Sequence, residues 1–376
     1  MTLRRRSSAY WLGANRAHRQ VGRSPMRKIS DALHTRALAM LLLANVFWGL
    51  SFPLIKALLF LNSRLSPGNA AFAVACTVAP RFLIGALVLA AWQCRPGARR
   101  PDAGLRAAPR PWLTKEELRH GLFVGSFGIA GMLLQNDGMR FTAASTSAFL
   151  TQFYAILIPL WLALRHRRNP GARIWLSCAL VMAGIAILGR LDWRQMHLGR
   201  GELETLLCSV FFMVQILSLE NPAFSATRPE KVTLVWLALE AAAFGSMTLA
   251  SAPGPGSIIG PWCSFPWLGL TLLLTVFCTL GAFSIMTKWQ PRITATEAGL
   301  MYCFEPIFGS LFALFLPGIF SRWAGIAYGN EAASANLMIG GGLITVANVL
   351  VQLQPPAKAG FPSAVKTRAA GLRDWY

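Results

Sequence analysis

Ten apolar runs constrain what this chain can fold into more than any other feature of its sequence. A helix of about 20 residues crosses the hydrocarbon core of a bilayer, and lipid requires every backbone polar group to be paired internally. The runs lie at residues 37–60, 71–93, 119–136, 142–164, 174–191, 201–219, 232–251, 266–286, 294–316 and 335–353. They predict an all-α polytopic membrane protein with ten transmembrane helices.

Composition excludes several other classes. The chain is 54% hydrophobic and 14% charged, so a soluble fold is improbable. Its net charge of +21 resides in loops and tails rather than on one polar surface, which argues against a nucleic-acid partner. The seven cysteines lack framework or metal spacing. No phosphate loop or histidine metal motif is present, so we expect no cofactor and no enzyme activity.

Lysine and arginine are distributed unevenly between alternate connecting segments. One set of segments holds 28 of these residues and the other holds six. Because basic residues are retained on the cytoplasmic side, both termini are predicted to be cytoplasmic and the number of spans to be even. Residues 1–36 form a basic tail, which could be a cytoplasmic extension or an organelle-targeting peptide. In the first case, Met26 is an alternative start. Residues 354–376 form the C-terminal tail.

The chain also repeats itself. The segment Ala144–Leu150 resembles Ala295–Met301 at an offset of 151 residues, and each precedes a proline-containing apolar stretch. The repeat predicts two five-helix halves, 37–191 and 201–353. Since five is odd, the second half enters the membrane from the opposite side, as in the inverted repeats of many secondary transporters.

The first apolar run, Leu38–Leu61, contains Trp48, Gly49 and Pro53 near its middle. Proline removes a helix hydrogen bond, and a broken helix in lipid is tolerated where protein or a wet cavity satisfies the backbone. We therefore expect a helix broken at residues 49–53. The repeat places the break beside a cavity between the halves, where Trp48 is a candidate for contacting a ligand.

Ionisable residues inside predicted spans are candidates for function, because each is costly unless paired or hydrated. Arg81 could bind an anionic group, pair with Asp137 or Glu305, or brace the backbone. Glu305 must be protonated, paired or facing water, and a proton-coupling role would use that choice. Glu240 needs a partner on another helix. Lys56 is expected to snorkel to the outer rim.

Neutral polar residues extend the candidate path. Gln152, Tyr154 and Tyr302 could recognise a solute through hydrogen bonds, although polar residues also hold transmembrane helices together. With Trp48, Arg81 and Glu305 they form the predicted substrate path. Glu305 and Glu240 are the candidates for ion coupling, and no metal ligands are expected. Four glycines between residues 121 and 131 predict close helix packing.

Several motifs, taken in their order along the chain, resemble those of the EamA-like family of the drug/metabolite transporter superfamily. The resemblance covers residues 37–353. The motifs are Trp48-Gly49 with Lys56, Pro80-Arg81-Phe82, and Cys303-Phe304-Glu305-Pro306. The resemblance implies an inverted-repeat carrier in a bacterial inner membrane. The sequence departs from the family where a Gly-Glu pair usually follows the fourth span, since residues 165–168 read Arg-His-Arg-Arg. After the ninth span a loop, 317–334, offers Glu331 as the only such acid.

The sequence thus favours a secondary transporter, an exporter, that moves small metabolites, amino acids or drugs by alternating access. The alternatives are a membrane-embedded enzyme acting on lipid-linked substrates and a non-transporting membrane sensor. The expected partners are a small organic solute and the lipid bilayer, and the choice between monomer and homodimer stays open.

Overall fold

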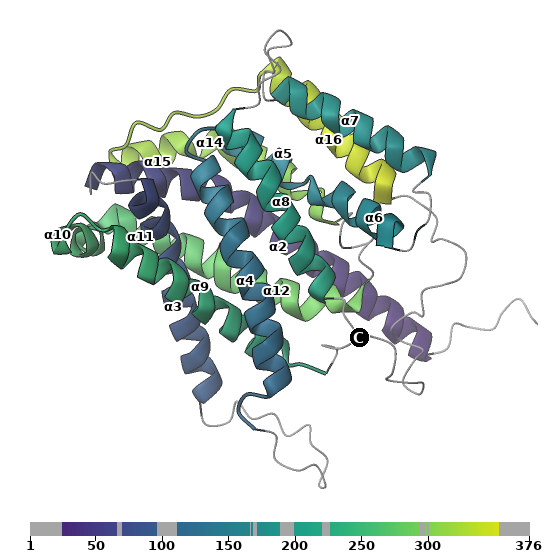
Figure 1. Ribbon diagram of the computed structural model, residues 1–376, viewed down its shortest axis with the longest axis horizontal. Helices are drawn as coiled ribbons and strands as arrows, with labels where there is room; N and C mark the ends of the chain where they lie inside the picture. The colour runs from purple at the N-terminus through teal and green to yellow at the C-terminus, as the bar shows by residue number, and fades with distance from the viewer. Residues whose placement is uncertain are drawn as a thin grey trace, which may run out of the picture.

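The computed structural model describes residues 25–65, 70–95, 111–165, 167, 171–188, 199–219, 226–293, 298 and 301–352. These ranges form helices and their connections and hold no β-strand, as the sequence predicts. The helices gather into one bundle (Figure 1).

The first half of the chain contains six α-helices in its described ranges. They are α2 (Pro25–Leu65), α3 (Ala70–Cys94), α4 (Lys115–Gly138), α5 (Ala144–Thr151), α6 (Tyr154–Arg165) and α7 (Ala172–Leu188). The predicted spans 37–60, 71–93 and 119–136 each fall within one helix. The predicted span 142–164 is divided between α5 and α6.

The second half contains a larger number of elements in its described ranges, several of which are short. They are α8 (Arg200–Leu219), α9 (Pro229–Ser251), α10 (Pro255–Ile259), η2 (Gly260–Cys263), α11 (Phe265–Leu273), η3 (Leu274–Gly281), α12 (Ala282–Trp289), η4 (Gln290–Arg292), α14 (Glu305–Phe315), α15 (Pro317–Ala324) and α16 (Ala335–Gln352). Of these, η3 is a π-helix between α11 and α12, within the predicted span 266–286.

The described helices make this a multi-pass membrane protein. By length and apolar composition, six helical segments could cross a bilayer, or seven if the bent pair α14 and α15 is one span. Two of the six join consecutive elements, Ala144–Arg165 and Phe265–Arg292. The helices α7 and α16 are apolar but shorter, and α4 is not among the six. Each of the ten predicted apolar runs thus overlaps a helix within the described residues. The number of ten membrane crossings stays a prediction.

The helix α2 corrects the prediction of a broken first span. It is continuous from Pro25 to Leu65, with Pro53 in its interior. Ser51 Oγ donates a hydrogen bond to the carbonyl of Trp48 at 2.6 Å. A Cβ on Gly49 would lie 2.6 Å from Phe308 Cβ, so this glycine permits close contact with α14 rather than a break.

The breaks occur instead in the two segments related by the sequence repeat. The helix α5 ends before Gln152 and α6 begins at Tyr154, while α14 begins at Glu305 after turns at residues 303 and 304. The two breaks are 151 residues apart, which is the offset of the repeat. Pro306 in the first turn of α14 cannot continue a preceding helix. No proline accounts for the break at Gln152.

Two further boundaries differ from expectation. The predicted tail of residues 1–36 is helical from Pro25, because a bilayer limits the apolar part of a span and not the length of its helix. The predicted loop 317–334 begins with α15, which bends by 49° from α14. Its first residue, Pro317, occupies the helix start that proline favours.

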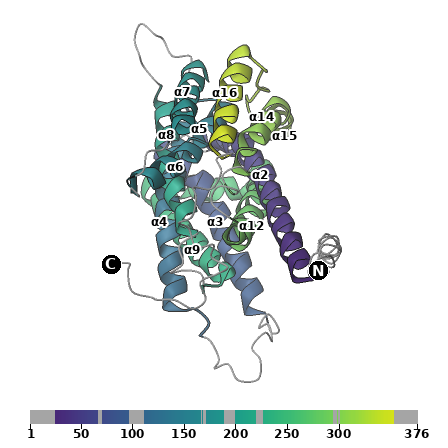
Figure 2. The same ribbon diagram turned by 90° about the vertical axis from the view of Figure 1, so that its right-hand side faces the viewer.

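Glycines allow the closest helix contacts. Gly184 of α7 and Gly340 of α16 face each other's backbone, so that a Cβ on either would lie under 3.0 Å from the partner's carbonyl oxygen. Figures 1 and 2 show these two helices side by side at the edge of the bundle. On α4, Gly121 and Gly125 pack against α9, and Gly131 packs against Phe212 of α8. The predicted close packing of this glycine stripe is confirmed.

A distant carboxylate caps α5. The residue before this helix, Ala143, offers no side-chain cap. Glu331 accepts hydrogen bonds from Ala144 N at 2.8 Å, Ser145 N at 3.4 Å and the Ser145 hydroxyl. Lys56 donates to the carbonyl of Thr142 at the same helix start. The segment after α15 therefore joins the two halves of the chain at the start of α5.

Glu331→Ala should lower the stability of the protein by about 1 kcal/mol, the usual contribution of a helix cap, and Glu331→Gln by less. Glutamine keeps one acceptor oxygen but loses the charge that favours a helix N-terminus. The apparent melting temperature in detergent reports the effect. Glu116→Ala, at an exposed position of α4, is the control; equal melting temperatures of both alanine variants would contradict the cap.

An ion pair joins the starts of α4 and α9. Glu117 accepts hydrogen bonds from Arg228 Nε at 2.6 Å and Nη2 at 2.8 Å, and from Thr114 N at 2.9 Å. Glu117 precedes the predicted span 119–136. Burial raises its pKa, but the hydrogen bonds from Arg228 and Thr114 outweigh burial and lower the pKa to about 2.

The Glu117 pair should make stability pH-dependent at low pH. A folded-state pKa of about 2, below the ordinary value of 4.5, contributes stability above pH 4.5 that is lost as the pH falls toward 2. Melting temperatures of wild type and Glu117→Gln should therefore differ most at neutral pH and converge below pH 4. A difference that stays constant from pH 7 to pH 3 would contradict the pKa shift.

Candidate functional site

One cavity lies among helices from both halves of the chain. The first half contributes Trp48, Ser51, Ile55, Arg81, Met132, Gln135, Thr151 and Tyr154. The second half contributes Phe212, Gln215, Ile216, Trp236, Cys278, Phe283, Met286, Tyr302 and Glu305. Trp48 and Arg81 lie near the middles of α2 and α3, so the cavity is deep within the membrane-spanning part of the bundle.

Six of the seventeen residues that line the cavity are aromatic. Phe283 stacks on Trp236 with ring centroids 4.5 Å apart, and Trp48 meets Tyr302 edge to face at 5.6 Å. Tyr154 meets Tyr302 at 6.3 Å. Such rings give an apolar surface whose shape is held by their mutual packing.

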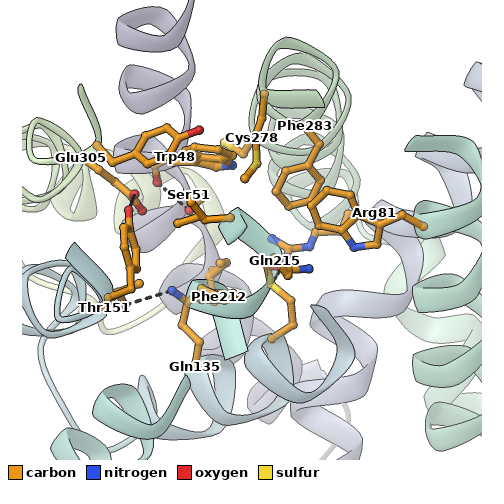
Figure 3. A pocket seen from close by; sticks show the side chains of 17 residues that line it. Trp48, Ser51, Arg81, Gln135, Thr151, Phe212, Gln215, Cys278, Phe283 and Glu305 are labelled. Atoms are coloured by element: carbon orange, nitrogen blue, oxygen red, sulfur yellow. Dashed lines mark hydrogen bonds between the residues drawn. The ribbon is translucent and has the colours of Figure 1, made fainter. Parts of the chain in front are cut away.

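Glu305 lies at one side of this cavity (Figure 3). Its Oε2 accepts hydrogen bonds from Gln152 Nε2 at 3.1 Å and from the Tyr154 hydroxyl at 3.4 Å. Gln152 Nε2 also donates to Tyr154 at 2.9 Å. Tyr154 and Glu305 are the first residues of α6 and α14 and are 151 residues apart, so the repeat places equivalent positions in contact.

Arg81 lies at the opposite side of the pocket in Figure 3. It is 3% exposed, and its Nη2 donates to Met132 Sδ at 2.9 Å. Glu240 interacts with it electrostatically without forming an ion pair. Glu240 Oε1 accepts from Trp236 Nε1 at 2.5 Å, and a Cβ on Gly128 would clash with Glu240, Gln215 and Trp236.

The cavity brings together most of the path predicted from sequence. Trp48, Arg81, Tyr154, Tyr302 and Glu305 line it. Gln152 does not line the cavity, but its side-chain amide donates a hydrogen bond to the Glu305 carboxyl group. Glu240 lies behind Trp236, and its hydrogen-bond partner is on its own helix rather than on another.

The two pairings named as alternatives for Arg81 do not form among the described residues. Asp137 pairs with Arg140 and Arg200 outside the cavity, and within the described ranges Arg81 makes no ion pair with Asp137 or Glu305. Lys56 lies outside the cavity lining and donates a hydrogen bond to the carbonyl of Thr142, and its position at the outer rim stays a prediction.

Sequence reasoning missed Phe212, Trp236 and Phe283 as cavity residues. A single aromatic residue in an apolar run is indistinguishable from one that faces lipid or core, so periodicity could not have found them. Trp236 and Glu240 are an exception, because a spacing of four places them on one helix face and could have indicated their hydrogen bond.

The cavity has a volume of about 70 Å³. Pockets for drug-sized ligands usually measure about 300–1,000 Å³. The structure therefore has room for a very small solute or a few waters, and a larger solute requires its side chains or helices to move.

Comparison with known proteins finds similarity to transporters. Residues 35–190 match the EamA-like transporter family. An "Uncharacterized transporter" of Archaeoglobus fulgidus is 20% identical over 275 residues, covering 73% of this chain and 76% of its own. A solved structure described as "Crystal structure of protein" has a TM-score of 0.49 and 19% identity, covering 82% of this chain and 96% of its own. Over residues 35–190 the chain is therefore similar to the EamA-like transporter family, in agreement with the motifs Trp48-Gly49 and Pro80-Arg81-Phe82 that lie in that range.

Proposed function

We propose that the protein is a secondary transporter that exports a small organic solute across a bacterial inner membrane by alternating access. The observation that carries this proposal is the cavity itself, whose lining residues are drawn from both halves of the chain. A site at the interface of two repeats near the membrane middle is reached from either side when one half moves against the other.

The broken helices support the same mechanism. The breaks between α5 and α6 and before α14 lie next to the cavity, where Thr151, Tyr154, Tyr302 and Glu305 line it. In lipid, irregular backbone is tolerated where it faces protein or a wet cavity. We infer that the two equivalent breaks belong to inverted repeats of residues 37–191 and 201–353, with ten crossings in total.

Polar contacts between the halves lie at both ends of α4. At its start Glu117 bonds Arg228 of α9, and at its end Asp137 pairs with Arg200 of α8. Alternating access requires contacts at the two ends of the bundle to loosen in turn. The exposed Asp137–Arg200 pair is weak and suited to reversible separation.

Glu305 is the proposed proton-coupling residue, with Glu240 as the second candidate. Glu305 lines the cavity, accepts two hydrogen bonds and has no cation within ion-pair distance among the described residues. A carboxyl group in such a place can gain or lose a proton as its access to water alternates.

Glu305→Gln should abolish transport driven by a pH gradient in proteoliposomes and leave counterflow exchange of the solute near the wild-type rate. Glutamine keeps an acceptor for Gln152 and Tyr154 but cannot carry a proton. The measurement is the initial rate under each condition. Glu230→Gln, at an exposed position of α9, is the control and should retain both activities; an unchanged pH dependence in Glu305→Gln would rule out this role.

Tags placed at the two ends of the chain should both be accessible from the cytoplasm only. The asymmetry of 28 against six basic residues predicts an even number of crossings. Protease protection in right-side-out and inside-out vesicles measures this. An external C-terminus would contradict the ten-span arrangement.

A further inference from the structure

We propose that the Arg81 side of the cavity is a binding subsite for the carboxylate of a small organic anion. The binding site can be tested without transport; only the identification of this anion as the transported solute rests on the proposed function.

The guanidinium of Arg81 is buried with its hydrogen-bonding capacity largely unused. Arg81 is 3% exposed and lines the cavity. Its Nη2 donates to the weak acceptor Met132 Sδ, and its Nε has no hydrogen-bond partner. Phe82 packs against the group at 4.8 Å from ring centroid to Cζ. A buried donor without an acceptor is costly, and guanidinium has five donors that match a carboxylate in pairs.

A purely structural arginine would have different neighbours. An arginine that braces helices donates to backbone carbonyls or to a carboxylate, as Arg228 does with Glu117, Pro111 and Trp112. Within the described ranges, Arg81 has no hydrogen bond to any oxygen atom. The contrast between the two arginines indicates that the acceptor for Arg81 comes from outside the chain.

Glu240 lies near Arg81 without forming an ion pair with it. Trp236 Nε1 and the absence of a side chain at Gly128 hold the Glu240 carboxyl group behind the cavity wall. Glu240 therefore does not occupy the donors of the guanidinium. The donors remain available to a ligand.

The rest of the cavity defines the ligand's other end. Trp48, Trp236 and Phe283 surround the space between Arg81 and Glu305 with rings. At about 70 Å³ the space admits only a short apolar body without rearrangement. The subsite thus fits a short carboxylic acid better than a bulky or multiply charged anion.

The test compares acids with their neutral amides, which match them in shape. Acid–amide pairs from acetate and acetamide to phenylacetate and phenylacetamide are titrated into the purified full-length protein by calorimetry. In at least one pair the acid should bind about tenfold more tightly or better than its amide, as expected for charge-assisted hydrogen bonds. An acid that never binds more tightly than its amide, including no binding of either, overturns the subsite.

Two variants separate recognition from folding. Arg81→Lys keeps the charge but loses the paired donors, so it should weaken acid binding about tenfold and leave amide binding unchanged. Arg64→Lys is the matched control, since Arg64 is outside the cavity lining and bonds the carbonyl of Gly325. Equal weakening of acid and amide by Arg81→Lys, at an unchanged melting temperature, would identify Arg81 as a structural brace and contradict the proposal.

Transport of the same pairs distinguishes this inference from the proposed function. Acid selectivity in binding without transport of any compound would support the subsite and contradict the transporter. Transport of acid and amide at equal rates, with equal affinity, would support the transporter and overturn the subsite.

Discussion

Lipid offers no hydrogen bonds, and the arrangement of this protein depends on that constraint. Continuous helices satisfy their own backbone, so α2 passes through Pro53 without interruption, and a hydroxyl at Ser51 bonds the nearby carbonyl of Trp48. Interruptions occur where protein surrounds them, beside the cavity at Gln152 and before Glu305. The same rule makes each buried polar group in the bundle either a partner of another group or a candidate for binding a ligand.

The two carboxylates near the cavity illustrate both outcomes. Glu305 faces the space and is held by Gln152 and Tyr154, whereas Glu240 is fixed behind the wall by Trp236. We propose Glu305 as the first candidate for proton exchange and Glu240 as the second. Neither carboxyl group occupies the donors of Arg81, which are left for a ligand. The cavity is thus polar at two sides and aromatic between them.

The halves of the chain share a plan but not every detail. The breaks recur at the repeat offset, and Tyr154 of one half touches Glu305 of the other. Glu331 caps α5 in the first half, whereas the corresponding place after α6 is basic in sequence, with Arg165 in the last turn of that helix. The cap depends on a distant segment, which is why neither the shape nor the target of residues 325–334 followed from local sequence patterns.

The sequence by itself determined the helical class, the apolar segments and the residues too polar to be buried without a reason, because hydropathy and charge depend only on residue type and spacing. It also indicated a resemblance to the EamA-like transporter family through motifs such as Pro80-Arg81-Phe82, which lies within the matched residues 35–190. Only the tertiary structure decided which helix faces meet. In the structure the helix breaks lie at Gln152 and before Glu305 rather than at Gly49, and Phe212, Trp236 and Phe283 line the cavity. Among the described residues, Arg81 has no carboxylate in an ion pair, although its charge alone would suggest one. These outcomes depend on contacts between residues far apart in the chain, and no local pattern encodes them.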